Sequence, residues 1–413
     1  MVLKTDEERL VSEIGEARKL INELEGTISY EEIKKNEVLA GEIVDCRIIR
    51  DCYEKAPIPS IEFEVGFPKL ESGKSFKITK ASDEQVEEAM SATRLALGTP
   101  GETTLEARPL AINALSSLIS QAIGGKSSLM CQTEDKAVAH QMNTSKKAAI
   151  INEMMALRND SCKLYECDGM VRYVAGSDYV YLPISELLDA FEAGLRKDFP
   201  NAEYTGGTIS HQIVQFNFIL NDELFKRRVE NILSQAGITE AYEPAVIFMT
   251  SNTGDCGANI IPVLHHKTKG NIIIEEPLKL EHRGKASIEE FSKNVEKIAA
   301  IMKATPEKIE ALADVLINHP AKAYRNVAVK AGLPVSCFVE QASCFEATYG
   351  NMATAIDLYF DLIDQLEIHS AKSNIGIIRK TKLLNGLAKV FLSLDNLKDC
   401  DVDVELTPNG MAA

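Results

Sequence analysis

The sequence of 413 residues lacks several features that would place a protein in a class at once. No stretch approaches the roughly 18–20 consecutive apolar residues that a bilayer-spanning helix requires. Met1 to Arg9 are charged and lead directly into a helical pattern, so we expect no secretory signal. Internal repeats and low-complexity runs are also missing. We therefore predict a cytoplasmic protein with no membrane partner.

The cysteines lack the spacing of a structural framework. There are nine, an odd number, and no C-x-x-C pair occurs among them. This pattern argues against a set of disulfides and against a zinc ribbon or knuckle. We predict reduced, mostly buried thiols.

The chain also lacks a polybasic tail, and its net charge is −16. An acidic excess keeps a protein soluble and repels a phosphate backbone at long range, although a local basic face can still bind nucleic acid. With 45% hydrophobic and 26% charged residues, the composition is that of a globular protein. The length predicts two or three compact units.

The amino-terminal part combines helix and strand patterns. Leu10, Ile14, Ala17 and Ile21 have helical spacing, and Ser29 with Glu32 forms a capping-box pattern that predicts a second helix. A half-buried strand is predicted over 61–67, where apolar residues alternate. Pro100 and Gly101 interrupt the pattern between residues 98 and 102, which predicts a first domain boundary there.

The middle part predicts hairpins and strands. Two strand-like segments, 162–167 and 170–174, flank Asp168-Gly169, the pair that a two-residue hairpin turn prefers. A helix is predicted over 185–195 and one long strand over 207–220. Three short apolar runs, each a strand candidate, follow at 245–249, 259–264 and 271–274.

After Glu281 the pattern is helical, with a capping box at Ser287 and Glu290. The order of elements predicts an α+β fold. We expect a mixed antiparallel sheet core with hairpins, flanked by an amino-terminal helix and strand segment and an all-helical carboxy-terminal region. The predicted units are residues 1–98, a core over 99–285 and a helical domain over 286–413.

Three segments of the core carry a resemblance to a known family. They are a strand and S-D-x-Y turn leading into a helix (169–190), Thr250 to Gly257, and Glu281 to Gly284. Together they resemble the phage/plasmid-like domain of unknown function 932, over residues 109 to 291. Thr253 stands near the place of the acid in the family's N-S-E-x-G segment. The residues that match the family's pattern are Ser177, Asp178, Tyr179, Ser251, Asn252, Gly254, His282 and Arg283.

The resemblance implies a protein of a mobile genetic element, acting in a bacterial host cytoplasm. It implies a role near DNA metabolism or in counteracting host defence, and it implies no particular chemistry. We assign no cofactor. The S-D-x-Y residues also have a purely structural interpretation, because Asp and Ser stabilise turns and Tyr packs at the start of the next element.

A phosphate-binding loop is not predicted at Gly124-Gly125-Lys126-Ser127-Ser128. The full motif needs a glycine where this chain has Ser120, and a buried strand where it has a helical pattern.

The segment Asp255–His266 is the candidate for an enzyme, either a hydrolase or a nuclease. Cys256 between glycines could be a thiolate nucleophile beside His265 or His266, but no orienting acid is evident. A metal cluster of these residues with His282 is an alternative; adjacent histidines on a strand point to opposite faces, so at most one could join it. A turn followed by a strand explains the same residues, and we assign no catalytic residue and no metal ligand.

Two basic stretches without acids lie in the helical region, one within 315–339 and one within 368–394. In so acidic a chain they could form a face for phosphate, although lysines on helices often only face solvent. The candidate nucleic-acid-binding residues are Lys322, Arg325, Lys330, Lys372, Arg379, Lys380, Lys382 and Lys389.

Three functional hypotheses follow. The first is a non-enzymatic phage or plasmid protein that binds single-stranded or duplex DNA in recombination or replication, or that counteracts host defence. The second is a phage structural or assembly protein that forms a homo-oligomer, and the third is the enzyme. The candidate partners are therefore nucleic acid, a host defence protein and further copies of the chain.

Overall fold

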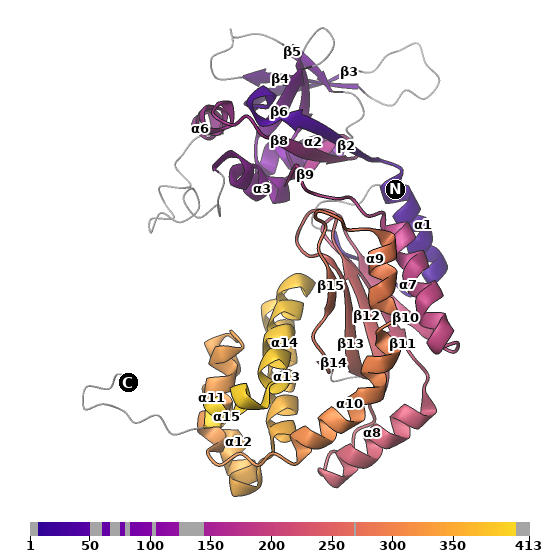
Figure 1. The fold of residues 1–413 in the computed structure, drawn as a ribbon. Coiled ribbons are helices and arrows are strands. Elements are labelled where there is room, and N and C mark those ends of the chain that lie inside the picture. The colour runs from indigo at the N-terminus through magenta and orange to yellow at the C-terminus, as the bar shows by residue number, and fades with distance from the viewer. Residues whose placement is uncertain are drawn as a thin grey trace, which may run out of the picture.

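The computed structural model describes residues 7–49, 60–66, 75–78, 83–100, 105–123, 144–267 and 270–401. Neighbouring strands pair antiparallel throughout these ranges, in three sheets. Figure 1 shows two smaller sheets at one end of an elongated molecule and a large sheet with the carboxy-terminal helices at the other. The predicted α+β class is confirmed. The glycine-rich segment 124–128 lies outside the described residues.

The large sheet has seven strands in the order β1-β10-β11-β12-β13-β14, with β15 also paired to β13. Its central strands are almost wholly apolar and buried, as expected for strands covered by helices on both sides. The bounds are β1 Arg9–Val11, β10 Glu203–Ile209, β11 Val214–Ile219, β12 Glu243–Thr250, β13 Ala258–His266, β14 Gly270–Ile273 and β15 Leu278–Leu280.

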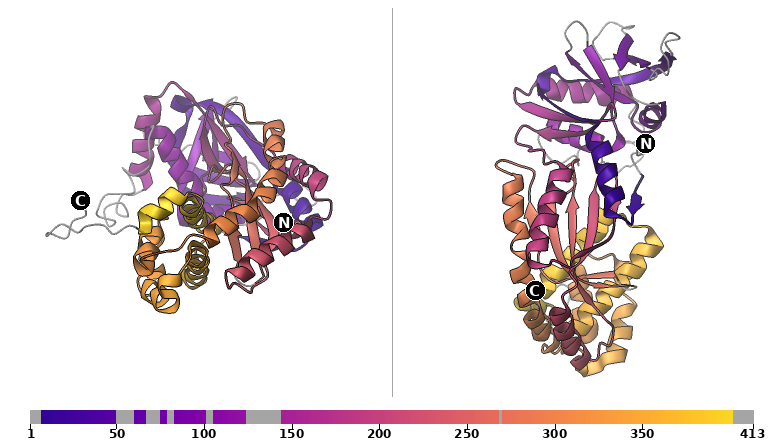
Figure 2. Two further views of the ribbon diagram at one scale, coloured as in Figure 1. Left: turned by 60° about the horizontal axis from the view of Figure 1, so that its bottom comes forward. Right: turned by 90° about the vertical axis from the view of Figure 1, so that its right-hand side faces the viewer.

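Helices cover the large sheet on two sides (Figures 1 and 2). On one side lie α1 Ile14–Glu25, α7 Ile184–Asp198 and α9 Ile288–Val295, where Phe191 of α7 stacks on Phe248 of β12 at 5.4 Å. On the other side lie α13 Ala355–Ser373 and α14 Ile377–Phe391. The remaining helices are α8 Glu223–Gln235, α10 Ile298–Ala313, α11 Pro320–Lys330, α12 Gln341–Tyr349 and α15 Leu394–Asp401, with short 3₁₀ turns η2 Val335–Cys337 and η3 Gly350–Met352.

The two smaller sheets form the other end of the molecule. The middle sheet has the order β2-β8-β9, and the distal sheet the order β5-β4-β3-β6-β7. Helices α3 and α6 pack with them through Leu118, Ile151 and Leu164, which share one buried cluster. The bounds are β2 Ile28–Lys34, η1 Lys35–Glu37, β3 Leu39–Ile49, β4 Ser60–Gly66, β5 Ser75–Ile78, α2 Asp83–Ala92, β6 Leu95–Pro100, β7 Leu105–Pro109, α3 Ile112–Ile123, α6 Thr144–Ala156, β8 Ser161–Cys167 and β9 Met170–Gly176.

The predicted hairpin at Asp168-Gly169 is confirmed. Both residues have positive φ, 55° and 75°, as a primed two-residue turn between β8 and β9 requires. The strand predicted over 61–67 is β4, and the three apolar runs after residue 245 are β12, β13 and β14. The carboxy-terminal region is helical as predicted, beginning at the Ser287 cap, whose hydroxyl accepts from the Glu290 N–H.

Two predicted elements were wrong. The segment that begins with Ser29 is strand β2, because its seven residues pair with β8, and this non-local pairing overrides the local capping pattern. The segment 207–220 is a hairpin and not one strand. Its turn is held by Ser210, whose N–H donates to the Ile213 carbonyl at 2.9 Å and whose hydroxyl accepts from the Ile213 N–H.

The boundary predicted near residue 98 falls inside β6, which pairs with both β3 and β7. The break in the pattern arises because Thr99 and Pro100 continue β6 beyond the end of its pairing with β3. The first hundred residues are also not separate, since β1 joins the large sheet and β2 the middle sheet. At the second boundary, α9 packs on α7 and does not begin a detached unit.

The cysteines whose side chains the structure describes are free thiols, of which Cys256 is half-buried, Cys344 exposed and the rest buried: Cys162, Cys167, Cys256, Cys337, Cys344 and Cys400. Among the described helices, none combines the length and the apolar composition needed to cross a bilayer.

Candidate functional site

The three segments that carry the resemblance meet in space. Tyr179 forms an antiparallel bridge with Arg283, and the Val180 N–H donates to the His282 carbonyl at 3.0 Å. The Gly284 N–H donates to the Asp178 carbonyl at 3.1 Å. We call residues 177–180, 250–257 and 281–284 the motif junction. It lies where the middle sheet meets the end of the large sheet at which β12 stops and β13 starts.

Tyr179 connects the segments of the motif junction. Its hydroxyl donates to the Asn252 carbonyl at 3.1 Å, and its ring stacks on His282 at 5.6 Å. Tyr173 of β9 meets the same ring edge-on at 5.6 Å. Since Tyr179 is only 5% exposed, its ring is a structural centre of the junction.

Further tyrosines line the middle-sheet side of the motif junction. Tyr30 of β2 packs against Tyr165 at 5.0 Å and against Tyr181 at 4.6 Å. Burial raises the pKa of the hydroxyls of Tyr30, Tyr165, Tyr179 and Tyr181, so these groups are neutral at ordinary pH. Aromatic rings with their polar tips thus form the contact between the two halves of the molecule.

The loop from Thr250 to Gly257 is held by its own side chains. The Ser251 hydroxyl accepts from the backbone N–H groups of Thr253 and Asp255 at 3.2 and 3.3 Å. Thr253, which stands near the place of the family's acid, donates its hydroxyl to the Asp255 carboxylate at 2.8 Å. A carboxylate is therefore present in this loop, two residues after the position at which the resemblance would place one.

Burial decides the charges at the motif junction. It lowers the pKa of His282, whose Nδ1 lies 3.2 Å from the Val180 carbonyl and whose Nε2 lies 3.3 Å from the Thr250 hydroxyl. A carbonyl only accepts, so Nδ1 carries the proton of the neutral ring and Nε2 accepts from Thr250. Burial also raises the pKa of Asp255, and it raises that of Cys256 to about 12. A thiol in this state is a poor nucleophile.

Asn252 carries a buried amide at the motif junction that lacks a hydrogen-bond partner among the described residues. Its side chain belongs to a residue that is 3% exposed, and within the described residues neither its Oδ1 nor its Nδ2 has a protein partner. A buried amide without partners costs free energy unless water or a ligand satisfies it.

The histidines of the enzyme hypothesis lie elsewhere. His265 and His266 end β13, whereas Cys256 precedes its first residue, and a nine-residue strand spans about 26 Å. His265 Nδ1 is 2.8 Å from Asn271 Oδ1, and His266 packs near Tyr242. Gly257, which follows Cys256, instead lies against the backbone of Leu280 and Glu281, the residues that precede His282.

The basic residues of α14 share an exposed face. Arg379, Lys382 and Lys389 are three and seven residues apart, spacings that place them on one side of a helix, and all three are exposed. No ion pair forms at these three side chains within the described residues. We call this set the α14 cationic face.

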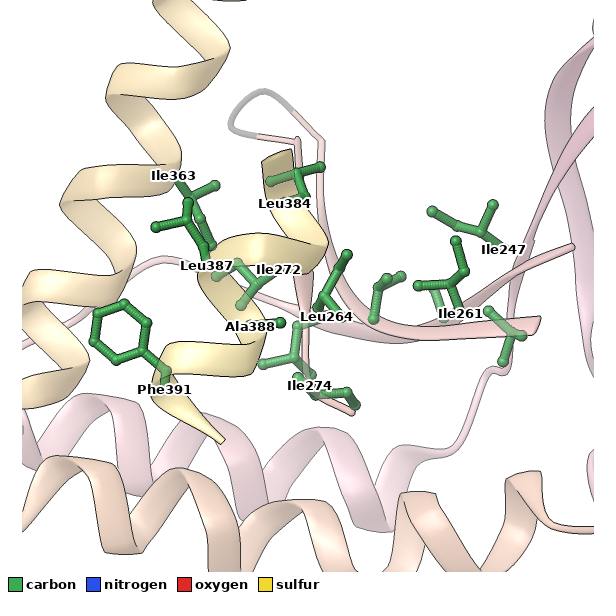
Figure 3. Close-up of a cluster of buried hydrophobic side chains, with 14 of the residues drawn as sticks. Ile247, Ile261, Leu264, Ile272, Ile274, Ile363, Leu384, Leu387, Ala388 and Phe391 are labelled. Atoms are coloured by element: carbon green, nitrogen blue, oxygen red, sulfur yellow. The ribbon is translucent and has the colours of Figure 1, made fainter. Parts of the chain in front are cut away.

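The opposite side of α14 fixes the helix to the large sheet. Figure 3 shows Leu384, Leu387, Ala388 and Phe391 meeting Ile363 of α13 and apolar side chains of the sheet strands. These four residues of α14 are buried. The α14 cationic face therefore sits on an anchored helix and not on a mobile tail.

The other candidate basic residues are placed less uniformly. Lys330 lies at the end of α11, where it donates to Asn396 Oδ1 at 3.0 Å, and the Asn396 amide reaches the Lys389 carbonyl at 3.5 Å. Lys380 points away from the α14 cationic face and pairs with Glu367 at 2.6 Å. Arg325 bonds to Ser343 of α12, Lys322 lies on the preceding turn of α11, and Lys372 is exposed in the last turn of α13.

The α14 cationic face reaches the motif junction. The positive charge of Lys382 opposes the effect of burial on the pKa of both Asp255 and Cys256, so its ammonium group lies close to their loop. The sequence predicted these two groups of residues separately, and in the structure the charge of Lys382 acts on the loop that carries Asp255 and Cys256.

Sequence reasoning missed the tyrosines Tyr30, Tyr165 and Tyr173 of the junction, and also His211. Tyr165 and Tyr173 lie on the strand-like segments around Asp168, a pattern that could have indicated an aromatic face, whereas Tyr30 lies in the segment predicted as a second helix. His211 was missed because it lies in the segment 207–220, which was predicted as one long strand and not as a hairpin with a turn. Comparison of the chain with models of protein families, with curated proteins and with solved structures found no match in any of the three.

Proposed function

We propose that this chain binds nucleic acid, with the phosphate backbone lying along the α14 cationic face and past the loop of the motif junction. The observation that carries the proposal is a set of three exposed cations on one face of a helix whose other face is buried; none of the three pairs with an acid in the part of the chain that the structure describes. Lys330 extends the set at the end of α11, which approaches α14 closely. A Cβ at Gly386 would overlap the Ala331 carbonyl.

The acidic net charge of the chain limits the surfaces at which a phosphate backbone can bind. With a net charge of −16, most of the surface repels phosphate, so contact is favourable only where cations gather without acids. Residues 377–391 contain Arg379, Lys380, Lys382 and Lys389 and no Asp or Glu. Each phosphate neutralised releases counterions, which makes binding sensitive to salt.

A role in DNA recombination or replication, or in counteracting host defence inside a bacterial cell, would use such a face. These roles come from the resemblance of the motif segments to a phage and plasmid family. The arrangement at Cys256, with a protonated thiol far from His265 and His266, supports the non-enzymatic version of the proposal.

The test is fluorescence anisotropy of labelled single-stranded and duplex DNA at several salt concentrations. We expect the wild-type chain to bind with an affinity that falls as salt rises. In the triple variant R379Q/K382Q/K389Q the slope of log K against log salt should become shallower by up to about 3, since each contact contributes about 0.9.

A matched control removes the same number of exposed cations elsewhere. The variant R196Q/K197Q/R227Q has two sites in the last turn of α7 and one near the start of α8. It changes the net charge equally and should bind like the wild type, although it also removes the exposed pairs of Arg196 with Glu192 and of Lys197 with Glu296. Equal weakening in both triple variants would show a general effect of charge and would contradict the assignment to α14. Light scattering of the same samples reports whether the chain forms a homo-oligomer alone or only on DNA.

A further inference from the structure

Two hairpin turns from different sheets bring three potential metal ligands together. Cys167 ends β8 and Asp168 begins the β8–β9 turn of the middle sheet, while His211 lies in the β10–β11 turn of the large sheet. One ligand atom from each of the three residues lies within 4.8 Å of the others. Cys167 and His211 are buried, and the Asp168 side chain is 10% exposed.

The individual distances have the scale of a coordination sphere. The Cys167 sulfur is 3.8 Å from His211 Nδ1, and Asp168 Oδ2 is 3.9 Å from His211 Nε2. A tetrahedral ion with bonds of about 2.0–2.3 Å holds neighbouring ligand atoms about 3.3–3.8 Å apart. These distances involve the two different nitrogens of His211, whereas one ion binds only one of them. With one nitrogen chosen, the three ligand atoms lie within 4.8 Å of one another, so they need to approach by up to about 1 Å to meet one ion.

Backbone bonds fix the two turns. Asp168 has φ 55°, and its N–H donates to the Thr27 carbonyl at 3.4 Å. The turn that carries His211 is closed by the Ser210 and Ile213 bonds described above. The Thr27 hydroxyl donates to the Leu24 carbonyl at 2.9 Å and lies 3.3 Å from the Cys167 sulfur, so it is an outer-sphere neighbour of this ligand.

We infer that Cys167, Asp168 and His211 form a binding site for a divalent transition metal of the Zn²⁺ type, which joins the middle sheet to the large sheet. Thiolate, imidazole and carboxylate are the donors that zinc accepts, and three protein ligands leave a fourth position for water. The edge of the site at Asp168 is the part that solvent reaches. The inference is independent of the proposed nucleic-acid binding.

A nucleophilic triad of the same residues is the competing interpretation, because the imidazole lies between the thiol and the carboxylate. The exposure of Cys167 decides against it: the residue is 0% exposed, so no substrate can approach its sulfur. Burial, with the charge of Asp168, also raises the pKa of this thiol to about 12, which leaves it protonated until a metal displaces the proton.

The test uses the full chain, stripped with a chelator and titrated with Zn²⁺ or Co²⁺. We expect one equivalent of metal to bind, with a thiolate-to-cobalt charge-transfer band in the near-ultraviolet and a rise in the thermal midpoint. His211→Gln and Asp168→Asn should lose the band or weaken binding by 10-fold or more, about the smallest effect expected for a ligand. Asn tolerates the positive φ of residue 168, so that variant keeps the turn.

Cys162→Ala is the matched control. Cys162 is equally buried on the same strand but faces the core of the smaller sheets, so its removal should leave metal binding unchanged. The inference is overturned if the wild-type chain binds neither ion at excess free metal, or if Co²⁺ binds without the thiolate band. It is also overturned if His211→Gln, shown to be folded by circular dichroism, binds metal as tightly as the wild type.

Discussion

The motif junction and the α14 cationic face both concentrate polar residues, but they satisfy them in opposite ways. At the junction Tyr179, Asn252 and His282 are each at most 5% exposed, and backbone carbonyls, a hydroxyl and ring stacking hold the Tyr179 and His282 side chains. On α14 the cations Arg379, Lys382 and Lys389 are exposed and make no ion pair within the described residues. The polar side chains of the motif junction are buried, whereas those of the α14 cationic face are exposed to solvent.

Because of this difference, we expect the motif junction to contribute mainly to folding stability and the α14 cationic face mainly to binding. A buried, bonded side chain contributes to the folded state, and removing it leaves a cavity or an unpaired group. An exposed, unpaired cation contributes little to folding but remains available to a ligand. The charge of Lys382 acts on Asp255 of the junction, so substitutions on either side can show where one role ends and the other begins.

The largest effect is expected for Tyr179→Ala. The substitution removes a ring that contacts Tyr173 and His282 and should lower the free energy of unfolding by about 3–5 kcal/mol. Tyr179→Phe is the control, which keeps the ring, loses the hydroxyl that donates to the Asn252 carbonyl and should cost about 1 kcal/mol. Urea unfolding followed by circular dichroism measures both, since the chain has no tryptophan. Equal costs for the two variants would contradict a packing role for the ring.

The sequence predicted correctly those turns and helix ends that depend only on residues close together in the chain. Asp168-Gly169 fixed a hairpin because few residue pairs adopt two positive φ angles, and Ser287 with Glu290 marked the start of α9. The helix predicted from Ser29 was wrong, because the segment pairs with β8, a strand far away in the sequence. The turn at Ser210 was not predicted for another reason. It contains no Gly, Pro or Asn, and a serine side chain accepts the hydrogen bond that closes it.

The candidate site was predicted as separate fragments. The motif residues were found by their resemblance to a family, and the α14 cations by charge pattern, but nothing in the sequence indicated that Lys382 lies near Asp255. The aromatic contact between the sheets draws Tyr30, Tyr165 and Tyr179 from three distant segments. Such sites depend on non-local packing, so periodicity and spacing alone do not reveal them.

Gly254→Ala tests how tightly the loop packs on the middle sheet. Gly254 has φ 73°, and a Cβ there would overlap the Tyr173 hydroxyl and ring. Gly237→Ala is the control, since Gly237 has φ 81° but open space around it. The control should cost about 1 kcal/mol from backbone strain, and Gly254→Ala about 1–3 kcal/mol more from overpacking. Similar unfolding curves for the two variants would show that the loop can move away from Tyr173.

The pH dependence of stability tests the neutral state of His282. Burial lowers its pKa in the folded chain, so below about pH 6.5 the unfolded chain binds the proton more readily. The free energy of unfolding should be highest above about pH 6.5. It should decrease as the pH falls from there towards the lowered pKa of folded His282, by at most about 1.4 kcal/mol per pH unit for one group.

The comparison for this effect is His282→Gln, measured by urea unfolding at pH 7.5, 6.5 and 5.5. Its stability should fall less steeply over the same range than that of the wild type. The neighbouring charge of Glu281 opposes the shift, and it remains in both chains. If both chains lose stability with the same slope, the protonation of His282 is not coupled to folding.

The smallest effect on stability is expected on α14. The triple variant R379Q/K382Q/K389Q removes no contact that buries or pairs these side chains, so its free energy of unfolding should stay within about 0.5 kcal/mol of the wild-type value. Lys380→Gln is the control on the same helix, because it breaks a half-buried pair with Glu367 and should be the more destabilising change per residue. If the triple variant instead loses more than about 1 kcal/mol, the cations of α14 stabilise the fold, and weaker DNA binding by that variant could no longer be attributed to its charge alone.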